Sequence, residues 1–457
     1  MTHPLDKSAT DLAADLAARR IGALELTEAA IARIEERDPP LNAVVVRDFD
    51  RARDAAMAAD AAIARGKTGP LLGVPMTVKE SNNVAGLRTT WGVELFGHWT
   101  APTDAVAVER LKSAGAIILG KTNVPPFLAD WQSDNVIYGR SQNPWNLERT
   151  PGGSSGGAAA AVASGMSPIE LGSDIGGSIR VPSAFCGLYG HKPTWELVPS
   201  RGHQPPGTDS NAVPLAVVGP IARTADDLDL VLGVIAGPTE DLAKAYSLDL
   251  PKARGATLAD YRVLVIDSHP IAATDNEIRG ALHTLAGKLE RAGVWVARES
   301  ALLPDLESLH HLYGGMLNAV LSRGSPNPAP LTAHGWMDMQ DGQLVTRRAF
   351  ARLFEDFDVI LAPTYGRTAY PHDARPQDER THLIDNQETP YFDQLAWPGI
   401  ATLANLPATA APVGLSTDGM PIGVQIIGPA FEDRTTIHFA RLMEQAFGGF
   451  RFPPGYN

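Results

Sequence analysis

The chain has 457 residues, of which 44% are hydrophobic and 20% are charged. This length and composition allow a large buried core and are typical of a globular protein, not of a disordered one. The formal net charge is −13. Such an acidic chain argues against a nucleic-acid partner, because phosphate binding needs a concentrated face of Lys and Arg.

Cys186 is the single cysteine, which excludes an intramolecular disulfide. Between Phe185 and Gly187 it is expected to be a small buried residue. The N-terminus lacks a basic segment followed by an apolar one, so no signal peptide is expected. No uninterrupted apolar run approaches the roughly 20 residues that a membrane span needs. We therefore expect a cytoplasmic protein that does not associate with membranes.

Helices and strands are predicted to alternate along the chain. Apolar side chains at near-helical spacing predict two helices before Pro39, and an alanine-rich stretch predicts a third from about Asp50 to Arg65. Strands are then predicted at 73–79, 116–120, 261–267, 293–297 and 358–362, and helices at 104–115, 277–291 and 347–357. Such alternation favours an α/β fold: a single large domain with a mixed twisted β-sheet surrounded by α-helices.

Two stretches, residues 200–211 and about 324–344, have the composition of long loops. Long irregular segments in compact proteins are often lids or pocket walls. The alternative for each stretch is an exposed surface loop without a role in a pocket.

The most informative stretch runs from Thr150 to Thr194 and contains two clusters of small residues. The first is GGSSGG over 152–157, and the second is GGS over 176–178. Glycines allow close backbone approaches that a Cβ forbids, and the residues after each cluster favour a helix. Backbone amides at a helix start can bind an oxyanion, so a serine there has the geometry that acyl transfer needs.

Three interpretations compete for the first cluster. A phosphate-binding loop would need a Lys after its last glycine, which is absent. The segment Gly152–Gly156 matches G-x-S-x-G, the nucleophile elbow of α/β-hydrolases, but that elbow directly follows a β-strand. The preceding NPWNLERTP over 143–151 is unsuited to a strand interior. A glycine-rich turn without chemistry is the third interpretation.

The whole constellation overturns that third interpretation, because the sequence resembles the amidase signature family over most of its length. Besides the two clusters, the resembling segments are GVPMTVKE (73–80), GKTN (120–123), YG (138–139), NPW (143–145), DVILAPT (358–364), LP (406–407) and GMPIGVQ (419–425). The resemblance implies one amidase domain over 1–457, with an N-terminal helical segment (1–65), a signature core (70–230) and a mainly helical insert that covers the pocket (240–350).

The resemblance also implies roles for individual residues. Ser178 matches the nucleophile, Lys79 the base, and Ser154 a bridging serine that in relatives follows a cis peptide bond. Ser155 matches a serine that supports the hydrogen-bond network. The implied oxyanion-hole amides are those of Ile175, Gly176, Gly177 and Ser178. The implied substrate-pocket residues are Leu128, Ala129 and Asp130.

A Ser–Ser–Lys unit without histidine requires a neutral lysine, whereas the reference pKa of lysine is about 10.4. Burial among apolar residues would lower the pKa of Lys79 towards about 7. Neutral Lys79 would then take the proton of Ser154 while Ser154 takes that of Ser178, which attacks the carbonyl. The same relay would return the proton to the leaving nitrogen.

No His-x-x-x-His or cysteine cluster has metal-ligand spacing, so we expect no metal and no cofactor. Asp174 and Arg180 flank the nucleophile and are expected to hold the loop structurally rather than to catalyse. The oligomeric state stays open, with a homodimer among the alternatives.

The substrate is the least determined feature. The chain is similar in size and layout to bacterial amidases reported as urethanases, and the apolar segment PPFLA over 125–129 favours bulky or aromatic substrates. We therefore expect a serine hydrolase that cleaves amides, with aryl amides and carbamates (urethanes) as candidates. The alternative is the A-type subunit of a tRNA-dependent amidotransferase, which releases ammonia from glutamine. Against it, KPT over 192–194 continues with Trp195-Glu196-Leu197, where amidotransferase subunits usually have Tyr-Gly-Arg.

Overall fold

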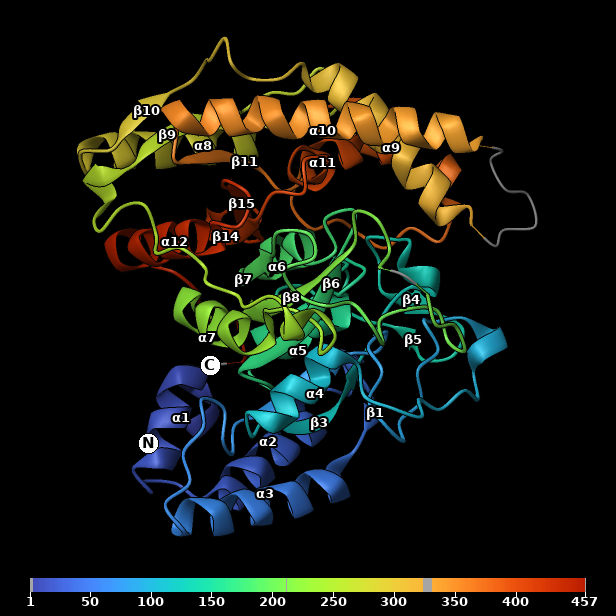
Figure 1. Cartoon of the computed structure of the whole chain (residues 1–457), viewed down its shortest axis with the longest axis vertical. Coiled ribbons are helices and arrows are strands. Elements are labelled where there is room, and N and C mark those ends of the chain that lie inside the picture. The colour runs from blue at the N-terminus through green and yellow to red at the C-terminus, as the bar shows by residue number, and fades with distance from the viewer. Residues whose placement is uncertain (1–2, 211, 324–330, 457) are drawn as a thin grey trace.

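A mixed β-sheet runs through the middle of the molecule (Figure 1). The computed structural model describes residues 3–210, 212–323 and 331–456. Within them, eleven strands form the sheet in the order β1-β3-β2-β6-β8-β7-β14-β15-β11-β9-β10. These strands are β1 (Val44–Arg47), β2 (Pro75–Lys79), β3 (Ile117–Thr122), β6 (Ile169–Asp174), β7 (Tyr189–Lys192), β8 (Val217–Ala222), β9 (Arg262–Val265), β10 (Trp295–Ala297), β11 (Val359–Pro363), β14 (Ala408–Leu415) and β15 (Pro421–Ile427).

Helices cover both ends and the faces of this sheet, with α1 to α3 at one end and α9 and α10 at the other (Figure 1). They are α1 (Ala9–Ala17), α2 (Ala23–Arg37), α3 (Phe49–Ala64), α4 (Val106–Ser113), α5 (Gly156–Ala163), α6 (Arg180–Cys186), α7 (Ala225–Ile235), α8 (Asn276–Arg291), α9 (Leu306–Leu321), α10 (Ala333–Asp356), α11 (Ala396–Leu403) and α12 (Asp433–Phe447). No helix within the described ranges has the length and apolar character needed to cross a bilayer. The predicted α/β fold with a mixed sheet is confirmed.

The strand pairing explains why the sheet is mixed. Strand β2 pairs in parallel with β3 and with β6, and β9 pairs in parallel with β10 and β11. The strands between these two groups pair antiparallel. Two short hairpins, β4 (Asp134–Asn135) with β5 (Gly139–Arg140) and β12 (Thr381–Ile384) with β13 (Gln387–Pro390), lie outside the sheet. The five strands predicted from the sequence are confirmed as β2, β3, β9, β10 and β11 within a few residues at each end.

Helices α5 and α6 follow the two small-residue clusters, as their composition predicts. Every residue of α5 is buried, and the helix packs on β2, β6 and α6. Its alanines and glycines permit this close packing, because larger side chains would separate the helix from the sheet. Helix α6 ends at Gly187, whose φ of 72° gives the left-handed C-terminal cap that glycine favours.

The prediction of a loop over about 324–344 is wrong for the residues from 333 onward, which form the first half of α10. Thr332 caps this helix by accepting a hydrogen bond from Gly335 N at 2.9 Å. Gly335 and Gly342 weaken the helical pattern in the sequence, but packing on α9 outweighs their low propensity. Residues 324–330 lie outside the described residues. The predicted loop over 200–211 is confirmed for 200–210, and residue 211 lies outside the described part.

Candidate active site

Three segments meet at the carboxyl ends of β2 and β6. Lys79 is the last residue of β2, and the 175–178 loop follows directly after β6. Because these two strands are parallel neighbours, their carboxyl ends lie at the same edge of the sheet. Ser154 and Ser155 precede α5, which packs on both strands. The fold therefore brings the residues of the predicted Ser–Ser–Lys unit together.

Lys79 is fully buried and its ammonium nitrogen contacts two serines. Nζ donates to Ser154 Oγ at 2.7 Å and to Ser173 Oγ at 2.9 Å, with a longer contact to the Ser173 carbonyl at 3.4 Å. A neutral amine in this position could accept the Ser154 proton through the shorter of these contacts.

Burial lowers the pKa of Lys79 to about 7, although the charges of Asp174 and Glu170 oppose the shift. Glu170 is itself fully buried, and burial raises its pKa to about 8 against the opposing hydrogen bonds from Thr77 and Thr122. The surroundings therefore favour a large neutral fraction of Lys79 near neutral pH.

Burial alone does not distinguish Lys79 from other lysines. Burial also lowers the pKa of Lys121 to about 8 and that of Lys192 to about 7. Lys121 donates to the Arg88 carbonyl and to Thr89 Oγ1, and Lys192 donates to the carbonyls of Pro193 and Leu406. Among these three buried lysines, Lys79 is the one that contacts the hydroxyl of Ser154.

The serines are arranged around the start of α5. The peptide bond between Gly153 and Ser154 is cis, as the resemblance implies. Ser155 N donates to the Ser178 carbonyl at 3.2 Å, and its hydroxyl donates to the Ser173 carbonyl at 3.3 Å. Ser155 thus links the two serine-bearing segments. In the described part of the chain, no hydrogen bond joins the hydroxyls of Ser154 and Ser178, and no histidine is hydrogen-bonded to either hydroxyl.

Three of the four predicted oxyanion-hole amides are available. Among the described residues, the amides of Ile175, Gly176 and Ser178 have no hydrogen-bond acceptor. The Gly177 amide, in contrast, already donates to Asp174 Oδ1 at 2.9 Å. Gly177 has a φ of 89°, the left-handed conformation that glycine adopts without strain. Within the described residues, three of the four predicted amides are therefore without an acceptor and one is already engaged.

Arg180 and Asp174 form a buried ion pair beneath the loop. Two guanidinium nitrogens of Arg180 contact the two carboxylate oxygens at 2.9 and 3.0 Å. The remaining donors reach Gln425 Oε1 at 2.7 Å, Thr402 Oγ1 at 2.9 Å and the Pro398 carbonyl at 3.0 Å. Burial would raise the pKa of Asp174, but the charge and hydrogen bonds of Arg180 outweigh it and hold the pKa at about 2. These contacts are consistent with the expectation that Asp174 and Arg180 hold the loop in place rather than catalyse.

The predicted pocket segment, Leu128 to Asp130, lies against the Gly153–Ser154 peptide. A Cβ on Gly153 would lie only 2.4 Å from the Asp130 carbonyl oxygen, so the close approach requires glycine. The Asp130 carboxylate accepts hydrogen bonds from Arg380 at 2.7 Å and from the Tyr391 hydroxyl at 2.6 Å. Asp130 is therefore engaged within the protein and is not a free charge for a substrate.

Sequence reasoning missed three residues that contact the candidate site. Ser173 accepts a hydrogen bond from Lys79, Trp131 Nε1 donates to the Gly176 carbonyl at 2.9 Å, and the Tyr313 hydroxyl donates to the Ile175 carbonyl at 2.8 Å. A polar Ser173 in an otherwise buried strand next to Asp174 was a usable signal. Nothing in the local sequence around Tyr313 indicates its partner, which lies 138 residues away.

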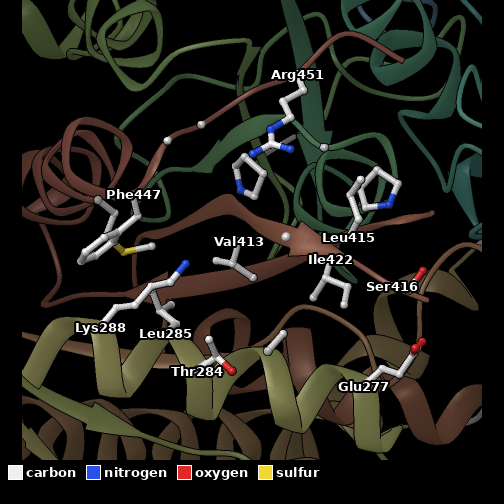
Figure 2. Close-up of a pocket in the computed structure, with 18 of the residues that line it drawn as sticks. Glu277, Thr284, Leu285, Lys288, Val413, Leu415, Ser416, Ile422, Phe447 and Arg451 are labelled. Atoms are coloured by element: carbon white, nitrogen blue, oxygen red, sulfur yellow. The ribbon is translucent and has the colours of Figure 1, made fainter. Parts of the chain in front are cut away.

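A cavity of about 540 Å³ lies elsewhere, between α8, the β14–β15 hairpin and the end of α12 (Figure 2). Its lining includes Leu285, Val413, Ile422 and Phe447, and none of the predicted site residues. Gly187 at the C-terminal end of α6 also lines it, whereas Ser178 precedes the N-terminal end of that helix. This cavity is therefore not the pocket of the Ser–Ser–Lys unit. In the described residues, no group of three or more His, Cys, Asp or Glu side chains is arranged to hold a metal ion.

Comparison with protein families gives a match to the family model described as Amidase, over residues 25–327 and 320–437. In sequence, the chain is similar to the A subunit of the glutamyl-tRNA(Gln) amidotransferase of Roseiflexus castenholzii. The two are 35% identical over 466 residues, with 92% of each chain covered.

Two solved structures are similar over the whole chain. One belongs to a study of a vestigial protein complex and the evolutionary origins of an s-triazine catabolic enzyme, with a TM-score of 0.85, 28% identity, and coverage of 98% of this chain and 100% of the other. The second is a bacterial aryl acylamidase of the amidase signature enzymes, with a TM-score of 0.82, 25% identity and 98% of each chain covered. The extent of these matches covers both the sheet and the segments that converge on Lys79.

Proposed function

The chain belongs to the amidase family, an enzyme family that acts on carbon–nitrogen bonds of amides, and on that premise we propose that it hydrolyses its substrate through a covalent acyl-enzyme on Ser178. Lys79 is the base and Ser154 relays the proton between the two. The observation that carries this proposal is the 2.7 Å contact between the fully buried Lys79 Nζ and Ser154 Oγ. A serine hydroxyl is a poor nucleophile until a base removes its proton, and this contact provides the base.

The steps follow from the residues around Lys79. Neutral Lys79 accepts the Ser154 proton while Ser154 Oγ accepts that of Ser178, whose oxygen attacks the carbonyl carbon. The carbonyl oxygen becomes an oxyanion stabilised by free amides of the 175–178 loop. The proton then returns through Ser154 to the leaving nitrogen, the C–N bond breaks, and the amine departs. Water attacks the acyl-enzyme by the same relay and releases the acid.

Neutral amides with apolar or aromatic groups, including aryl amides, are the first substrate class that we propose, with aryl carbamates as a further member. The side chains packed on the 175–178 loop support it. Cβ atoms placed on Gly176 and Gly177 would lie 3.2 Å from Leu395 Cδ2 and 3.1 Å from Pro398 Cβ. The arginines of the neighbouring segments, Arg180 and Arg380, are paired with Asp174 and Asp130. We further propose that α9, within the predicted insert, covers the pocket, since it places Tyr313 against the loop.

Glutamine is the second candidate substrate, with the chain acting as the A-type subunit of an amidotransferase that releases ammonia. The relatives in sequence support this candidate better than they support aryl amides or carbamates, since they are named as A subunits of glutamyl-tRNA(Gln) amidotransferases. The two candidates share the acyl-enzyme chemistry and differ in the pocket and in the need for partner proteins.

A single panel of assays tests the chemistry and separates the substrates. The purified chain is incubated with anilides, primary amides, aryl carbamates and glutamine, beside Ser178→Ala, and the site of fluorophosphonate labelling is located by mass spectrometry. Labelling at Ser178 with hydrolysis of neutral anilides supports the first candidate. Glutamine hydrolysis that appears only when the other components of an amidotransferase are added supports the second. Hydrolysis that is retained in Ser178→Ala would contradict the acyl-enzyme proposal.

The rate of hydrolysis is expected to rise with pH through a midpoint near the pKa of Lys79, which burial lowers to about 7. The reactive form is the neutral amine, so the rate falls below this pKa and levels off above it. The measurement is kcat/KM between pH 5 and 9. Lys121→Met is the control, because Lys121 is buried but does not contact Ser154, and its midpoint should match that of the wild type. A flat profile across this range contradicts the assignment of Lys79 as the base.

A further inference from the structure

Two side chains from distant segments hold consecutive carbonyls of the 175–178 loop. The Tyr313 hydroxyl, from α9, donates to the Ile175 carbonyl at 2.8 Å. Trp131 Nε1, from the segment after Asp130, donates to the Gly176 carbonyl at 2.9 Å. Both side chains are buried, with 0% and 5% of their surface exposed, so these hydrogen bonds are shielded from competing water.

A carbonyl that is held also fixes the amide in the same peptide unit. The peptide bond is planar, and in its trans form the C=O of one residue and the N–H of the next point in opposite directions. The Ile175 carbonyl shares its peptide unit with the Gly176 amide. Tyr313 therefore draws that carbonyl towards α9 and turns the Gly176 amide to the other side of the loop. Among the described residues, the Gly176 amide has no other partner that would hold it.

The next peptide unit is held at both of its ends. Trp131 donates a hydrogen bond to the Gly176 carbonyl, and Asp174 Oδ1 accepts a hydrogen bond from the Gly177 amide at 2.9 Å. Loss of the Trp131 contact would still leave the Asp174 contact in place. Among the described residues, loss of the Tyr313 contact would leave the Ile175–Gly176 peptide unit without a hydrogen bond, so its orientation would be less constrained.

We propose that Tyr313 is a positioning residue that orients the Gly176 amide as an oxyanion donor for the Ser178 reaction. This inference rests on the proposed function and adds a contribution of α9 to its chemistry. Tyr313 does not touch the reacting atoms. It acts through the backbone of the 175–178 loop.

The surroundings of Tyr313 suit this role. Its ring lies directly on α11, where a Cβ on Gly399 would come within 2.7 Å of Tyr313 Cδ1. The absence of a side chain at Gly399 therefore determines how deeply the ring inserts, and hence where the hydroxyl lies. Burial raises the pKa of Tyr313, so the hydroxyl keeps its proton and stays a donor at every pH at which the enzyme would work.

The test is the second-order rate of fluorophosphonate labelling of the full-length protein, which needs no knowledge of the natural substrate. Phosphonylation of Ser178 also places a developing oxyanion at the loop. Tyr313→Phe removes only the hydroxyl and is expected to lower this rate by about 10-fold or more, because oxyanion stabilisation depends on prearranged donors. Trp131→Phe is expected to lower it less, since Asp174 still holds that peptide unit.

Tyr261→Phe is the matched control. Tyr261 is buried like Tyr313 and its hydroxyl also donates to a backbone carbonyl, that of Gly255, on a segment away from the 175–178 loop. Both Tyr→Phe variants lose one buried hydroxyl and are expected to lose similar thermal stability, but only Tyr313→Phe should lose labelling rate. The midpoint of the pH profile should not move in Tyr313→Phe, because the Tyr313 hydroxyl acts on the amide and not on Lys79.

The results separate this inference from the proposed function. Wild-type labelling at Ser178 together with an unchanged rate in Tyr313→Phe overturns the inference and leaves the acyl-enzyme intact. An equal loss of rate in Tyr261→Phe also overturns it, because the effect would then be one of general stability. A wild-type protein that is not labelled at Ser178 overturns both proposals.

Discussion

Lys79→Met is expected to lower the rate of amide hydrolysis by about 10³-fold, the range that a positioned general base contributes. Methionine has a similar length and fills the same buried space, but it cannot accept the Ser154 proton. Ser178 would then have to react as an unassisted hydroxyl. The measurement is kcat on the best substrate of the assay panel, with Lys67→Met as an exposed lysine control that should keep wild-type activity.

The same substitution is expected to stabilise the fold. In the folded protein burial lowers the pKa of Lys79 from 10.5 to about 7, so between these values the unfolded chain binds more protons. At 1.36 kcal/mol per pKa unit, the lysine therefore costs about 4 kcal/mol at pH 7, and this cost declines as the pH rises towards 10.5. Two lost hydrogen bonds of about 1 kcal/mol each offset part of the gain.

Urea unfolding at pH 7 and at pH 10 measures this stability difference. We expect Lys79→Met to raise the free energy of unfolding at pH 7 by about 2 kcal/mol and to lower it slightly at pH 10, where the two lost hydrogen bonds outweigh the small remaining cost of the lysine. A variant that is inactive and also less stable at pH 7 would contradict the buried, proton-poor state of Lys79. Activity within a few-fold of the wild type would contradict its role as the base.

Arg180→Met is expected to lower the free energy of unfolding by about 3 to 5 kcal/mol, because it leaves the buried carboxylate of Asp174 without its partner. All three guanidinium nitrogens of Arg180 are engaged, on Asp174, Gln425, Thr402 and the Pro398 carbonyl. The pKa of Asp174, held at about 2 by Arg180, should rise in the variant. Labelling of Ser178 should slow as well, because Asp174 holds the Gly177 amide.

Arg298→Met is the control for this prediction. Arg298 pairs with Glu290 at 2.9 Å, but their side chains are 51% and 43% exposed, so the pair is expected to contribute at most about 1 kcal/mol. Urea unfolding of both variants at pH 7 gives the comparison. If Arg180→Met and Arg298→Met lose similar small amounts of unfolding free energy, the Asp174 carboxylate must find another partner. That result would contradict the prediction that Asp174 depends on Arg180.

Five of the eleven strands that the described residues form in the sheet could be predicted from local patterns. Short apolar runs bounded by turn residues located β2, β3, β9, β10 and β11, since buried strands need continuous apolar sequence. The first half of α10 could not be located in this way. Its glycines and many exposed residues hide the helical pattern, and the helix depends on packing against α9.

Some features of the candidate site could likewise be predicted from the sequence, and others could not. The residue types needed for serine acyl transfer stand in recognisable segments, so Ser178, Ser154 and Lys79 could be singled out without a structure. The engagement of Asp130 by Arg380 and of the Gly177 amide by Asp174 could not be foreseen. The first contact joins residues 250 positions apart, and the second depends on how one loop folds back on itself.

The sequence by itself determined the fold class and the family, and it indicated the residues that we propose for a histidine-free serine reaction. Only the tertiary structure decided which amides of the 175–178 loop are free, and that Tyr313 and Trp131 hold its carbonyls. Hydrophobic periodicity and residue type are local properties of the chain and can be read along it. Hydrogen bonds between distant segments depend on strand order and helix packing, which exist only once the whole sheet has formed.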